Sequence, residues 1–208
     1  GVSEINKLKP IKIEDLLGRD SVLPYQNLSY LGFSDKCICV TGAGGSIGSE
    51  LCRQIYLLNP KKLIIIDNSE PSLYKINQEI IKVNPKHNSF RSVLGDVCDY
   101  NFLKKLFIEE KIDIVFHAAA YKHVPIVENN PLAGIKNNVF STFSIINVCY
   151  EVGLEKFILI STDKAVRPSN IMGASKRLSE QIVQAFASTT EKKTKYAMVR
   201  FGNVLGSS

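Results

Sequence analysis

The chain has 208 residues, of which 45% are hydrophobic and 22% charged, and its formal net charge is +6. This length and composition are typical of one globular domain with a substantial core. The basic residues are scattered, and the densest cluster, at residues 191–195, is typical of a solvated loop, so the charge does not indicate nucleic-acid binding. No apolar run reaches the roughly eighteen residues that a membrane span needs, and no signal peptide is visible.

Cysteine and histidine usage argues against a metal site. No two of the five cysteines form a Cys-x-x-Cys pair, and the three histidines are dispersed without ligand spacing. The cysteines are expected to be small buried hydrophobes in a reducing compartment, so we expect this stretch to be soluble and cytoplasmic. They are Cys37, Cys39, Cys52, Cys98 and Cys149.

Residues 1–35 are polar and irregular, with one short helical candidate at Ile13–Leu17, and we expect them to form a lead-in segment. From residue 36 onward, apolar β-branched runs alternate with helical patterns. The expected strands are Cys37–Thr41, Leu63–Asp67, Ser89–Gly95, Ile112–Ala118, Lys156–Ser161 and Tyr196–Phe201. The expected helices are Gly48–Leu58, Pro71–Val83, Tyr100–Glu110, Ala133–Val152 and Ile171–Ala187.

The strand candidates are nearly continuous apolar runs, such as Leu63–Ile66, which is typical of strands buried on both faces of a parallel sheet. Alternation of strands and helices predicts a doubly wound α/β domain of the Rossmann type over residues 36–208. The chain begins at Gly1 and ends within an ordered-looking stretch, so we expect a partial domain.

A glycine-rich loop follows the first expected strand and opens a helix. Gly42, Gly45 and Gly48 recur at three-residue intervals, with Ser46 and Ile47 between the last two. Glycine permits the tight turn and the close approach of a pyrophosphate, and the helix N-terminus then presents its free N–H groups to the phosphates. The sequence therefore predicts a dinucleotide-binding site.

Asp67 ends the second expected strand, about twenty residues after the loop, where a carboxylate binds the adenosine ribose hydroxyls. This carboxylate would repel a 2′-phosphate, so NAD is favoured over NADP. The alternative for Asp67 is a helix cap for the following segment.

Two further strand ends fit a cofactor site. Asp96 and Val97 end the third expected strand, where a carboxylate and a backbone amide can hold adenine, although Asp96 can equally be a turn aspartate. The small residues Ala118, Ala119 and Ala120 end the fourth expected strand and leave room for a cofactor. Tight helix packing is the other explanation for them.

The stretch STDKAVRPSNIMGASK, residues 161–176, has the pattern of a dehydrogenase-type active site with one departure. Such sites often end in Tyr-x-x-x-Lys on a helix, but Met172 stands four residues before Lys176. Methionine cannot exchange a proton, so either the chain is not an enzyme or its acid/base chemistry lies elsewhere. Met172 can also be an ordinary core residue.

Five segments carry a resemblance to a known family: residues 13–19 (IEDLLGR), 41–50 (TGAGGSIGSE), 118–125 (AAAYKHVP), 161–168 (STDKAVRP) and 200–207 (RFGNVLGS). Together they resemble the bacterial polysaccharide-biosynthesis nucleotide-sugar dehydratases, a branch of the extended short-chain dehydrogenase/reductase superfamily. The resemblance implies an NAD-dependent UDP-N-acetylglucosamine 4,6-dehydratase of capsule, O-antigen or glycan biosynthesis. It also implies a homo-oligomeric parent protein tethered at the cytoplasmic face of the bacterial inner membrane, with a substrate-binding region after residue 208.

The membrane-linked branch of this family also carries Met in place of Tyr, so the resemblance implies catalysis without the tyrosine. Dehydration of the hexose needs hydride transfer from carbon 4 to NAD, removal of the carbon-5 proton, protonation of the departing carbon-6 hydroxyl, and return of the hydride to carbon 6. Asp163 is the candidate general acid and Lys164 the candidate base at carbon 5. A lysine can act so only if its pKa falls, through desolvation or through a cation such as Arg167 or Lys176.

Further roles follow from the same assignment. Thr162 would bind the carbon-4 oxygen, Lys176 would hold the nicotinamide ribose, and Met172 would be an apolar wall, while a bound water or Asp163 takes the carbon-4 proton. Other candidate residues are Ser161 for the cofactor, Lys122 and Asn203 for the substrate, and Asn138 as a supporting helix residue. Two alternatives remain open: a carbon-4 epimerase, which would leave Asp163 and Lys164 without a role, and a non-catalytic dinucleotide-binding module.

Overall fold

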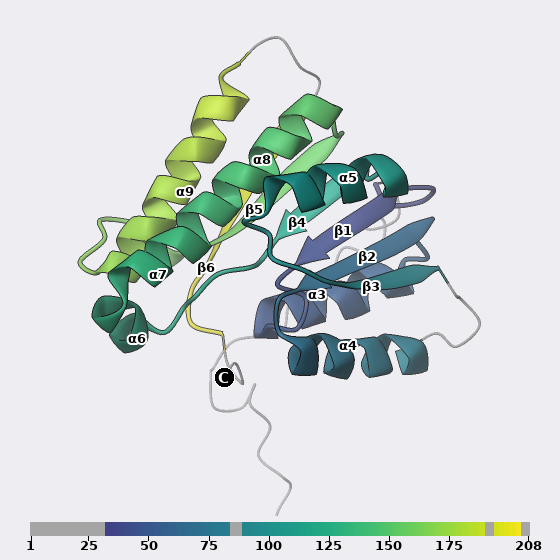
Figure 1. Ribbon diagram of the computed structural model, residues 1–208, viewed down its shortest axis with the longest axis horizontal. Helices are drawn as coiled ribbons and strands as arrows, with labels where there is room; N and C mark the ends of the chain where they lie inside the picture. Colours follow the sequence, from purple (N-terminus) through teal and green to yellow (C-terminus); the bar gives the residue numbers. More distant parts are fainter. Residues whose placement is uncertain (1–31, 84–88, 190–193, 205–208) are drawn as a thin grey trace, which may run out of the picture.

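The computed structural model describes residues 32–83, 89–189 and 194–204. The helix expected at Ile13–Leu17, most of the lead-in segment and the last four residues of the RFGNVLGSS stretch lie outside the described residues. The described part forms one six-stranded parallel sheet in the order β3-β2-β1-β4-β5-β6, as Figure 1 shows. This strand order is that of the doubly wound Rossmann fold, so the predicted fold class is confirmed.

The strands closely match the apolar runs of the sequence. Each is parallel to its neighbours, and β1 pairs with β2 on one side and with β4 on the other. The strands are β1 (Cys37–Thr41), β2 (Lys62–Asp67), β3 (Phe90–Leu94), β4 (Ile114–His117), β5 (Lys156–Thr162) and β6 (Lys195–Phe201).

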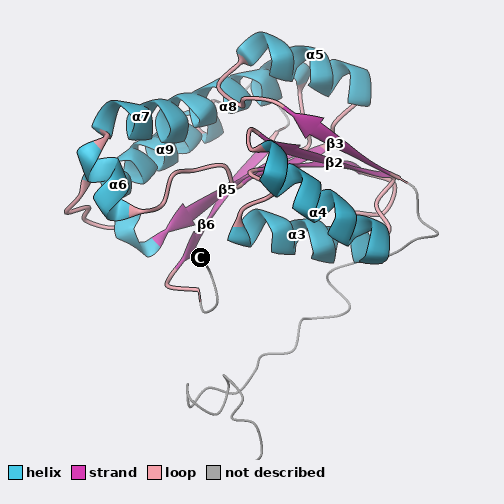
Figure 2. Ribbon diagram, turned by 60° about the horizontal axis from the view of Figure 1, so that its bottom comes forward, coloured by secondary structure: helices cyan, strands magenta, loops and turns pink. Residues whose placement is uncertain are grey.

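Helices cover both faces of the sheet (Figures 1 and 2). The helices α3 and α4 lie on one face, and α5, α8 and α9 lie on the other. Their bounds are α3 (Ser46–Leu57), α4 (Glu70–Val83), α5 (Tyr100–Glu110), α6 (Val124–Asn129), α7 (Pro131–Ile135), α8 (Ser141–Val152) and α9 (Ile171–Ala187). A π-helical segment occupies Lys136–Phe140, and a 3-10 turn occupies Asp163–Ala165.

Successive residues of the central strands serve two separate cores. Ile38 and Val40 of β1 pack with the helices α3 and α4, whereas Cys37 and Cys39 pack on the opposite side with residues of α5 and α8. This alternation is the period of two of a strand, and it explains why an apolar residue is needed at every position of a strand with two covered faces. Four of the five cysteines are buried, as predicted, and Cys98 is only partly covered.

The region between β4 and β5 differs from the expected single helix at Ala133–Val152. It contains α6, α7, the π-helical segment and α8 in succession. Pro125 and Pro131 stand in the first turns of α6 and α7, where a missing backbone N–H costs little. The π-helical segment adds a local irregularity that apolar periodicity does not reveal, and π-bulges are frequent at functional sites.

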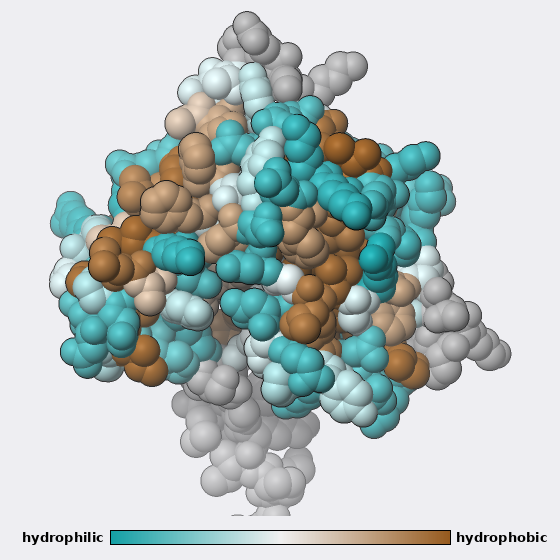
Figure 3. Space-filling view, in the orientation of Figure 1, coloured by the Kyte–Doolittle hydropathy of each residue, from teal (hydrophilic) through white to brown (hydrophobic). Residues whose placement is uncertain are grey.

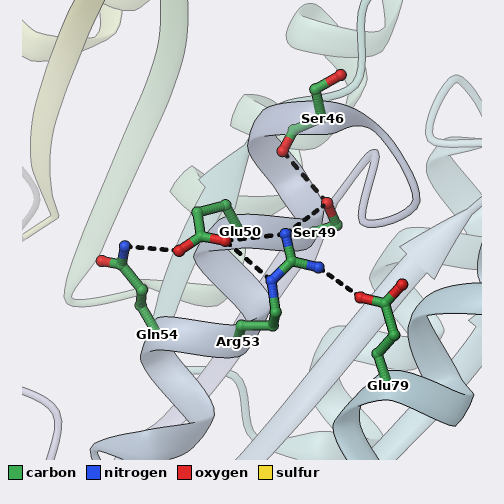
Figure 4. Close-up of polar contacts among 6 residues, drawn as sticks. All are labelled: Ser46, Ser49, Glu50, Arg53, Gln54 and Glu79. Carbon is green, nitrogen blue, oxygen red and sulfur yellow. Dashed lines mark hydrogen bonds and ion pairs between the residues drawn. The ribbon is translucent and has the colours of Figure 1, made fainter. Parts of the chain in front are cut away.

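Ion pairs connect α3 to α4, which cover the same face of the sheet, as Figure 4 shows. Arg53 of α3 bonds Glu50 on its own helix and Glu79 on α4, and Gln54 donates to Glu50 at 2.9 Å. These side chains are about a third or more exposed, so each pair contributes no more than about 1 kcal/mol. The contacts therefore align the two helices more than they stabilise the fold.

Apolar side chains also reach the surface. Leu132 of α7 is 81% exposed, and Phe140, which ends the π-helical segment, and Phe143 of α8 are each at least half exposed. Apolar patches among polar residues are visible over these helices in Figure 3. Within the described ranges, no helix is both long and apolar enough to cross a membrane.

Candidate active site

Two adjoining hollows lie at the carboxyl ends of the strands, where β1 and β4 lead to helices on opposite faces of the sheet. Ligands of open α/β sheets bind at this point. The larger hollow has a volume of about 490 Å³ and the smaller one about 310 Å³, which are sizes suited to small molecules. Gly45, Ala118, Ala120 and Tyr121 line both hollows, so the two form one continuous site.

The glycine loop between β1 and α3 is a cradle without side chains. Gly42 has φ +64°, and a Cβ there would lie 2.6 Å from the backbone of Ala119. A Cβ on Gly48 would lie 2.0 Å from the carbonyl oxygen of Gly42. Gly45 precedes α3 and caps it with extended backbone, so the first N–H groups of α3 are directed at the larger hollow, which Ser46, Ile47 and Gly48 line.

Asp67 lies in the smaller hollow, at the end of β2, and accepts hydrogen bonds from the backbone N–H groups of Gly44 at 2.8 Å and Ser69 at 2.9 Å. It therefore fixes the glycine loop and begins the turn into α4 in this structure. None of the described residues that line the smaller hollow is Lys or Arg. The surroundings of Asp67 thus offer no cation for a 2′-phosphate.

The other predicted cofactor residues separate into two groups. Val97 and Ala118–Ala120 line the smaller hollow. The Asp96 carboxylate does not line it, and accepts a hydrogen bond from the backbone N–H of Cys98 at 2.9 Å, which is the arrangement of a turn aspartate.

The larger hollow collects the residues for which catalytic and substrate roles are predicted, with the exception of Asp163, which is absent from its lining. The lining includes residues from α3, α6, β5, the 3-10 turn, α9 and β6, among them positions that the sequence did not single out. The predicted residues that line it are Ser161, Thr162, Lys164, Met172, Lys176, Lys122 and Asn203. The additional ones include His123, Ile126, Val127, Phe201 and Val204.

The Thr162–Lys164 turn stands at the mouth of the larger hollow. The hydroxyl of Thr162 donates to the Asp163 carboxylate at 3.0 Å, and the Lys164 ammonium donates to the side-chain oxygen of Asn203 at 3.1 Å. Lys164 also lies 3.7 Å from the Asp163 carboxylate. The hydrogen bond from Thr162, followed by the charge of Lys164, lowers the pKa of Asp163, so this carboxyl group is ionised near neutral pH.

Lys176 forms the buried side of the same hollow. Its side chain reaches back from α9 to donate to the carbonyl oxygen of Ile160 at 2.8 Å, and the residue is only 4% exposed. Burial lowers the pKa of Lys176 to about 8, although the negative charge of Glu180 opposes this shift. Met172 lies one turn before it and is 3% exposed, so the position that a tyrosine would occupy holds a buried apolar side chain.

Comparison with known proteins places this site in a family. Residues 38–208 match a family described as polysaccharide biosynthesis protein. The chain belongs to this family. Over 207 residues it is 45% identical to the capsular polysaccharide biosynthesis protein CapD of Staphylococcus aureus, with 100% of the chain and 34% of CapD aligned.

Two further relatives agree with this assignment. The chain is 36% identical to a UDP-N-acetylglucosamine 4,6-dehydratase (inverting) of Campylobacter jejuni, over 84% of the chain and 51% of that protein. The X-ray structure of Pen from Bacillus thuringiensis superposes with a TM-score of 0.77 at 31% identity, covering 85% of this chain and 53% of that one. The chain thus spans about half or less of the length of these relatives.

Asn138 connects three parts of the site in this family member. It lies in the π-helical segment, is fully buried, and bonds the backbone of Tyr121 in both directions, accepting from its N–H at 2.7 Å and donating to its carbonyl at 3.1 Å. Asn138 also donates to the hydroxyl of Ser175 on α9 at 2.9 Å. It therefore holds the Tyr121–Lys122 loop against the helix that carries Lys176.

His117 ends β4 beneath the two hollows. One ring nitrogen is 2.7 Å from the hydroxyl of Thr41 on β1, and the other is 3.3 Å from the hydroxyl of Ser141 on α8. Burial, followed by the nearby charge of Lys176, lowers the pKa of His117 to about 3, so the ring is neutral. No local sequence pattern around His117 indicates these contacts, because Thr41 and Ser141 lie 76 and 24 residues away.

Glu180 is the most important site residue that the sequence analysis missed. It lies four residues after Lys176 on α9 and accepts a hydrogen bond from Ser161 at 2.7 Å. The four-residue spacing from Lys176 was a usable signal, because residues at i and i+4 share one helix face. A carboxylate on the same face as an active-site lysine is a candidate partner for it.

Proposed function

We propose that the chain is the NAD-binding and catalytic part of a nucleotide-sugar 4,6-dehydratase that acts on UDP-N-acetylglucosamine. The observation that carries this proposal is the Asp163–Lys164 pair in the turn after β5, with Lys164 and Lys176 lining one hollow in which the tyrosine position holds a buried methionine. An acid and a base are what elimination across carbons 5 and 6 requires. A substrate-binding region after residue 208, a membrane tether and a location at the cytoplasmic face stay predictions.

The residues fit a nicotinamide dinucleotide. The glycine cradle has no room for side chains, the N-terminus of α3 suits a pyrophosphate, and Asp67 suits the ribose hydroxyls. The lack of a described cation in the smaller hollow favours NAD over NADP. NAD, when bound, would accept a hydride from carbon 4 of the sugar and later return it to carbon 6.

The ionised state of Asp163 suggests how the chain works without the tyrosine. An ionised carboxylate can take the proton of the carbon-4 hydroxyl, and the positive charge of Lys176 favours the negative oxygen that forms. Asp163 is then protonated and can give the same proton to the departing carbon-6 hydroxyl, which leaves as water. Lys164, acting as the neutral amine after it has released a proton to solvent, takes the carbon-5 proton, which the ketone at carbon 4 has acidified.

A carbon-4 epimerase would use neither Asp163 nor Lys164, and it would depend more on the tyrosine that Met172 replaces. A non-catalytic module would need no lysine buried at Lys176, where burial of an ammonium is costly. Self-association also stays a prediction; the exposed apolar side chains of α7 and α8 are a surface that it would bury (Figure 3).

Substitution of the acid and the base tests the assignment in the full-length protein, meaning this chain with any further sequence its gene encodes. Asp163→Asn and Lys164→Ala should each abolish formation of the 4-keto-6-deoxy sugar, while NAD content measured after gel filtration stays unchanged. Lys105→Ala, at a side chain 78% exposed on α5, is the matched control and should keep full activity. Full activity in either site variant would show that the roles are assigned to the wrong residues.

A further inference from the structure

Glu180 is a fully buried carboxylate with four hydrogen-bond donors around it. Its Oε1 accepts from the hydroxyl of Ser161 at 2.7 Å and from Nε of Arg200 at 2.8 Å. Its Oε2 accepts from Nη2 of Arg200 at 2.7 Å and from Nη1 of Arg177 at 3.2 Å. Arg200 thus binds both oxygens through its planar fork, the geometry in which arginine pairs most strongly with a carboxylate.

This network keeps Glu180 charged inside the protein. Burial by itself would raise the pKa of Glu180, but the hydrogen bonds from Arg200, Ser161 and Arg177 outweigh burial and lower the pKa to about 2. A buried charge is tolerated only when its partners replace the lost water. Both arginines are about 40% exposed on their side chains, so they reach Glu180 from the protein surface.

The contacts of Glu180 converge on the end of β5. Ser161 and Arg200 are register partners on the adjacent strands β5 and β6, and Glu180 bonds both side chains from α9. The residue before Ser161 is Ile160, whose carbonyl oxygen accepts from Lys176, one turn earlier than Glu180 on α9. Two residues one turn apart on α9 therefore hold two successive residues of β5, directly before the Thr162–Lys164 turn.

We infer that Glu180 is a positioning residue of this site, which fixes Ser161 and the end of β5 and supplies the negative charge that faces Lys176. It touches neither the larger hollow nor, by the proposed mechanism, any reacting atom, and it acts through Lys176 and Ser161. Its effect on Lys176 is independent of the proposed function, whereas its effect on turnover rests on that function.

Glu180 favours the charged form of Lys176, against the larger effect of burial. The described titratable and charged groups near Lys176 include Glu180 with its partners Arg177 and Arg200, His117 on β4, and four residues that line the same hollow, Tyr121, Lys122, His123 and Lys164. His117 is neutral, with a pKa of about 3. The Asp163 carboxylate stands outside the lining of the hollow and is already paired with Thr162 and Lys164. Glu180 is therefore the anion that favours the protonated form of Lys176.

Two substitutions at the Glu180–Arg200 contact distinguish an electrostatic effect of Glu180 on Lys176 from a purely structural one. Glu180→Gln removes the negative charge, so the pKa of Lys176 should fall below its value of about 8. Arg200→Gln leaves the carboxylate but removes its strongest partner, so the pKa of Lys176 should rise. Each shift should be about one pKa unit. Loss of packing alone would move Lys176 in the same direction in both variants.

The measurement is a pH titration of this chain labelled with ¹³C at the lysine ε-carbon and followed by NMR, with the Lys176 signal assigned by its absence in Lys176→Met. Arg177→Gln is the matched control, because it removes the longest of the four contacts, at 3.2 Å, and should raise the pKa least. If Glu180→Gln does not fold, the rise in Arg200→Gln remains the deciding result. Shifts of equal sign in the two variants, or no shift in Arg200→Gln, would overturn the inference.

Turnover in the full-length protein gives a second readout. If protonated Lys176 supports ketone formation, Glu180→Gln should move the alkaline limit of kcat to lower pH by the same amount as the NMR shift, with KM for the sugar unchanged. If the Lys176 pKa shifts are observed as predicted but the full-length protein forms no 4-keto-6-deoxy sugar, the effect of Glu180 on Lys176 is supported and the proposed function is refuted. Turnover with an unchanged alkaline limit of kcat would refute only the role of Glu180 in catalysis.

Discussion

Gly173, one residue after Met172, determines how closely the first turn of α9 approaches the Thr162–Lys164 turn. A Cβ added at Gly173 would lie 2.4 Å from the carbonyl oxygen of Lys164 and 3.2 Å from the Cβ of Pro168. Contacts of 2.4 Å with a backbone atom cannot persist, so any side chain at this position would push Lys164 away from its place beside Asn203. The missing side chain of Gly173 is therefore part of the site.

Gly173→Ala should destabilise the chain by about 1–3 kcal/mol, because overpacking forces the backbone to shift. In the full-length protein it should reduce turnover at least tenfold, since a misplaced catalytic group costs far more than a surface change, while NAD content stays unchanged. Urea unfolding of the chain and product formation measure the two effects. Gly32→Ala is the control, because the nearest atom to its Cβ would be a flexible lysine amine 3.6 Å away. Equal behaviour of the two variants would contradict this account.

Single residues of the candidate cofactor site could be proposed from local sequence patterns. The glycine spacing and Asp67 follow directly from the strand-loop-helix context. The contact of Glu180 with Ser161 and the contact of Lys164 with Asn203 were missed, since the two residues of each contact lie 19 and 39 positions apart in the sequence. Asp96 has a local role in a turn, and its sequence pattern is the same for a turn and for adenine binding.

At the scale of the elements, His117 joins β1, β4 and α8 at the base of the site. Its two ring nitrogens face the hydroxyls of Thr41 and Ser141, so a neutral ring can serve one hydroxyl as donor and the other as acceptor. Protonation would remove the acceptor and place a charge in a fully buried position next to Lys176. The hydrogen-bonded contacts of His117 with Thr41 and Ser141 are therefore expected to be sensitive to acid.

The pKa of His117 predicts how stability depends on pH. The folded chain does not protonate His117 until the pH approaches about 3, whereas an unfolded chain binds that proton below about 6.5. The unfolded state thus binds more protons in this window, and stability is lost as the pH falls. The free energy of unfolding should drop by about 2 kcal/mol between pH 7 and pH 5.

Urea titrations of the chain at both pH values measure this drop. In His117→Asn the free energy of unfolding should be lower at pH 7, because hydrogen bonds and packing are lost, but most of its decrease toward pH 5 should disappear. Even Glu180, with its pKa lowered to about 2, adds little to this decrease, because its ordinary value of 4.5 in the unfolded chain lies below the window from pH 7 to pH 5. An unchanged pH dependence in the variant would exclude His117 as its source.

Elements were predicted well where apolar runs dictate them. The expected bounds of β1, α5 and α9 agree with the structure at both ends. The expectation at Ala133–Val152 was less accurate, because Asn138 uses both side-chain atoms to hold Tyr121 and Ser175 and the helix forms a π-helical segment around it. Such tertiary hydrogen bonds override the local periodicity and leave no mark in it.

At the scale of the whole molecule, the sequence indicated a doubly wound parallel sheet but not the order of its strands. The observed order places the ends of β1 and β4 side by side and β5 next to β4, so the glycine loop and the Thr162–Lys164 turn meet at one edge. Residues between 42 and 204 of the chain thereby contribute to two adjoining hollows. This convergence is the reason that a cofactor and a second ligand can be proposed for the same edge.

The measurement that tests the central claim most directly follows one reaction. The full-length protein is incubated with UDP-N-acetylglucosamine in heavy water, and the sugar is observed by proton NMR. Our account predicts a 4-keto-6-deoxy product with deuterium at carbon 5, because Lys164 exchanges the abstracted proton with solvent before the position is protonated again. Conversion to the galacto isomer without deuterium would contradict it and indicate an epimerase. No conversion of this sugar in the protein with NAD bound would contradict it as well.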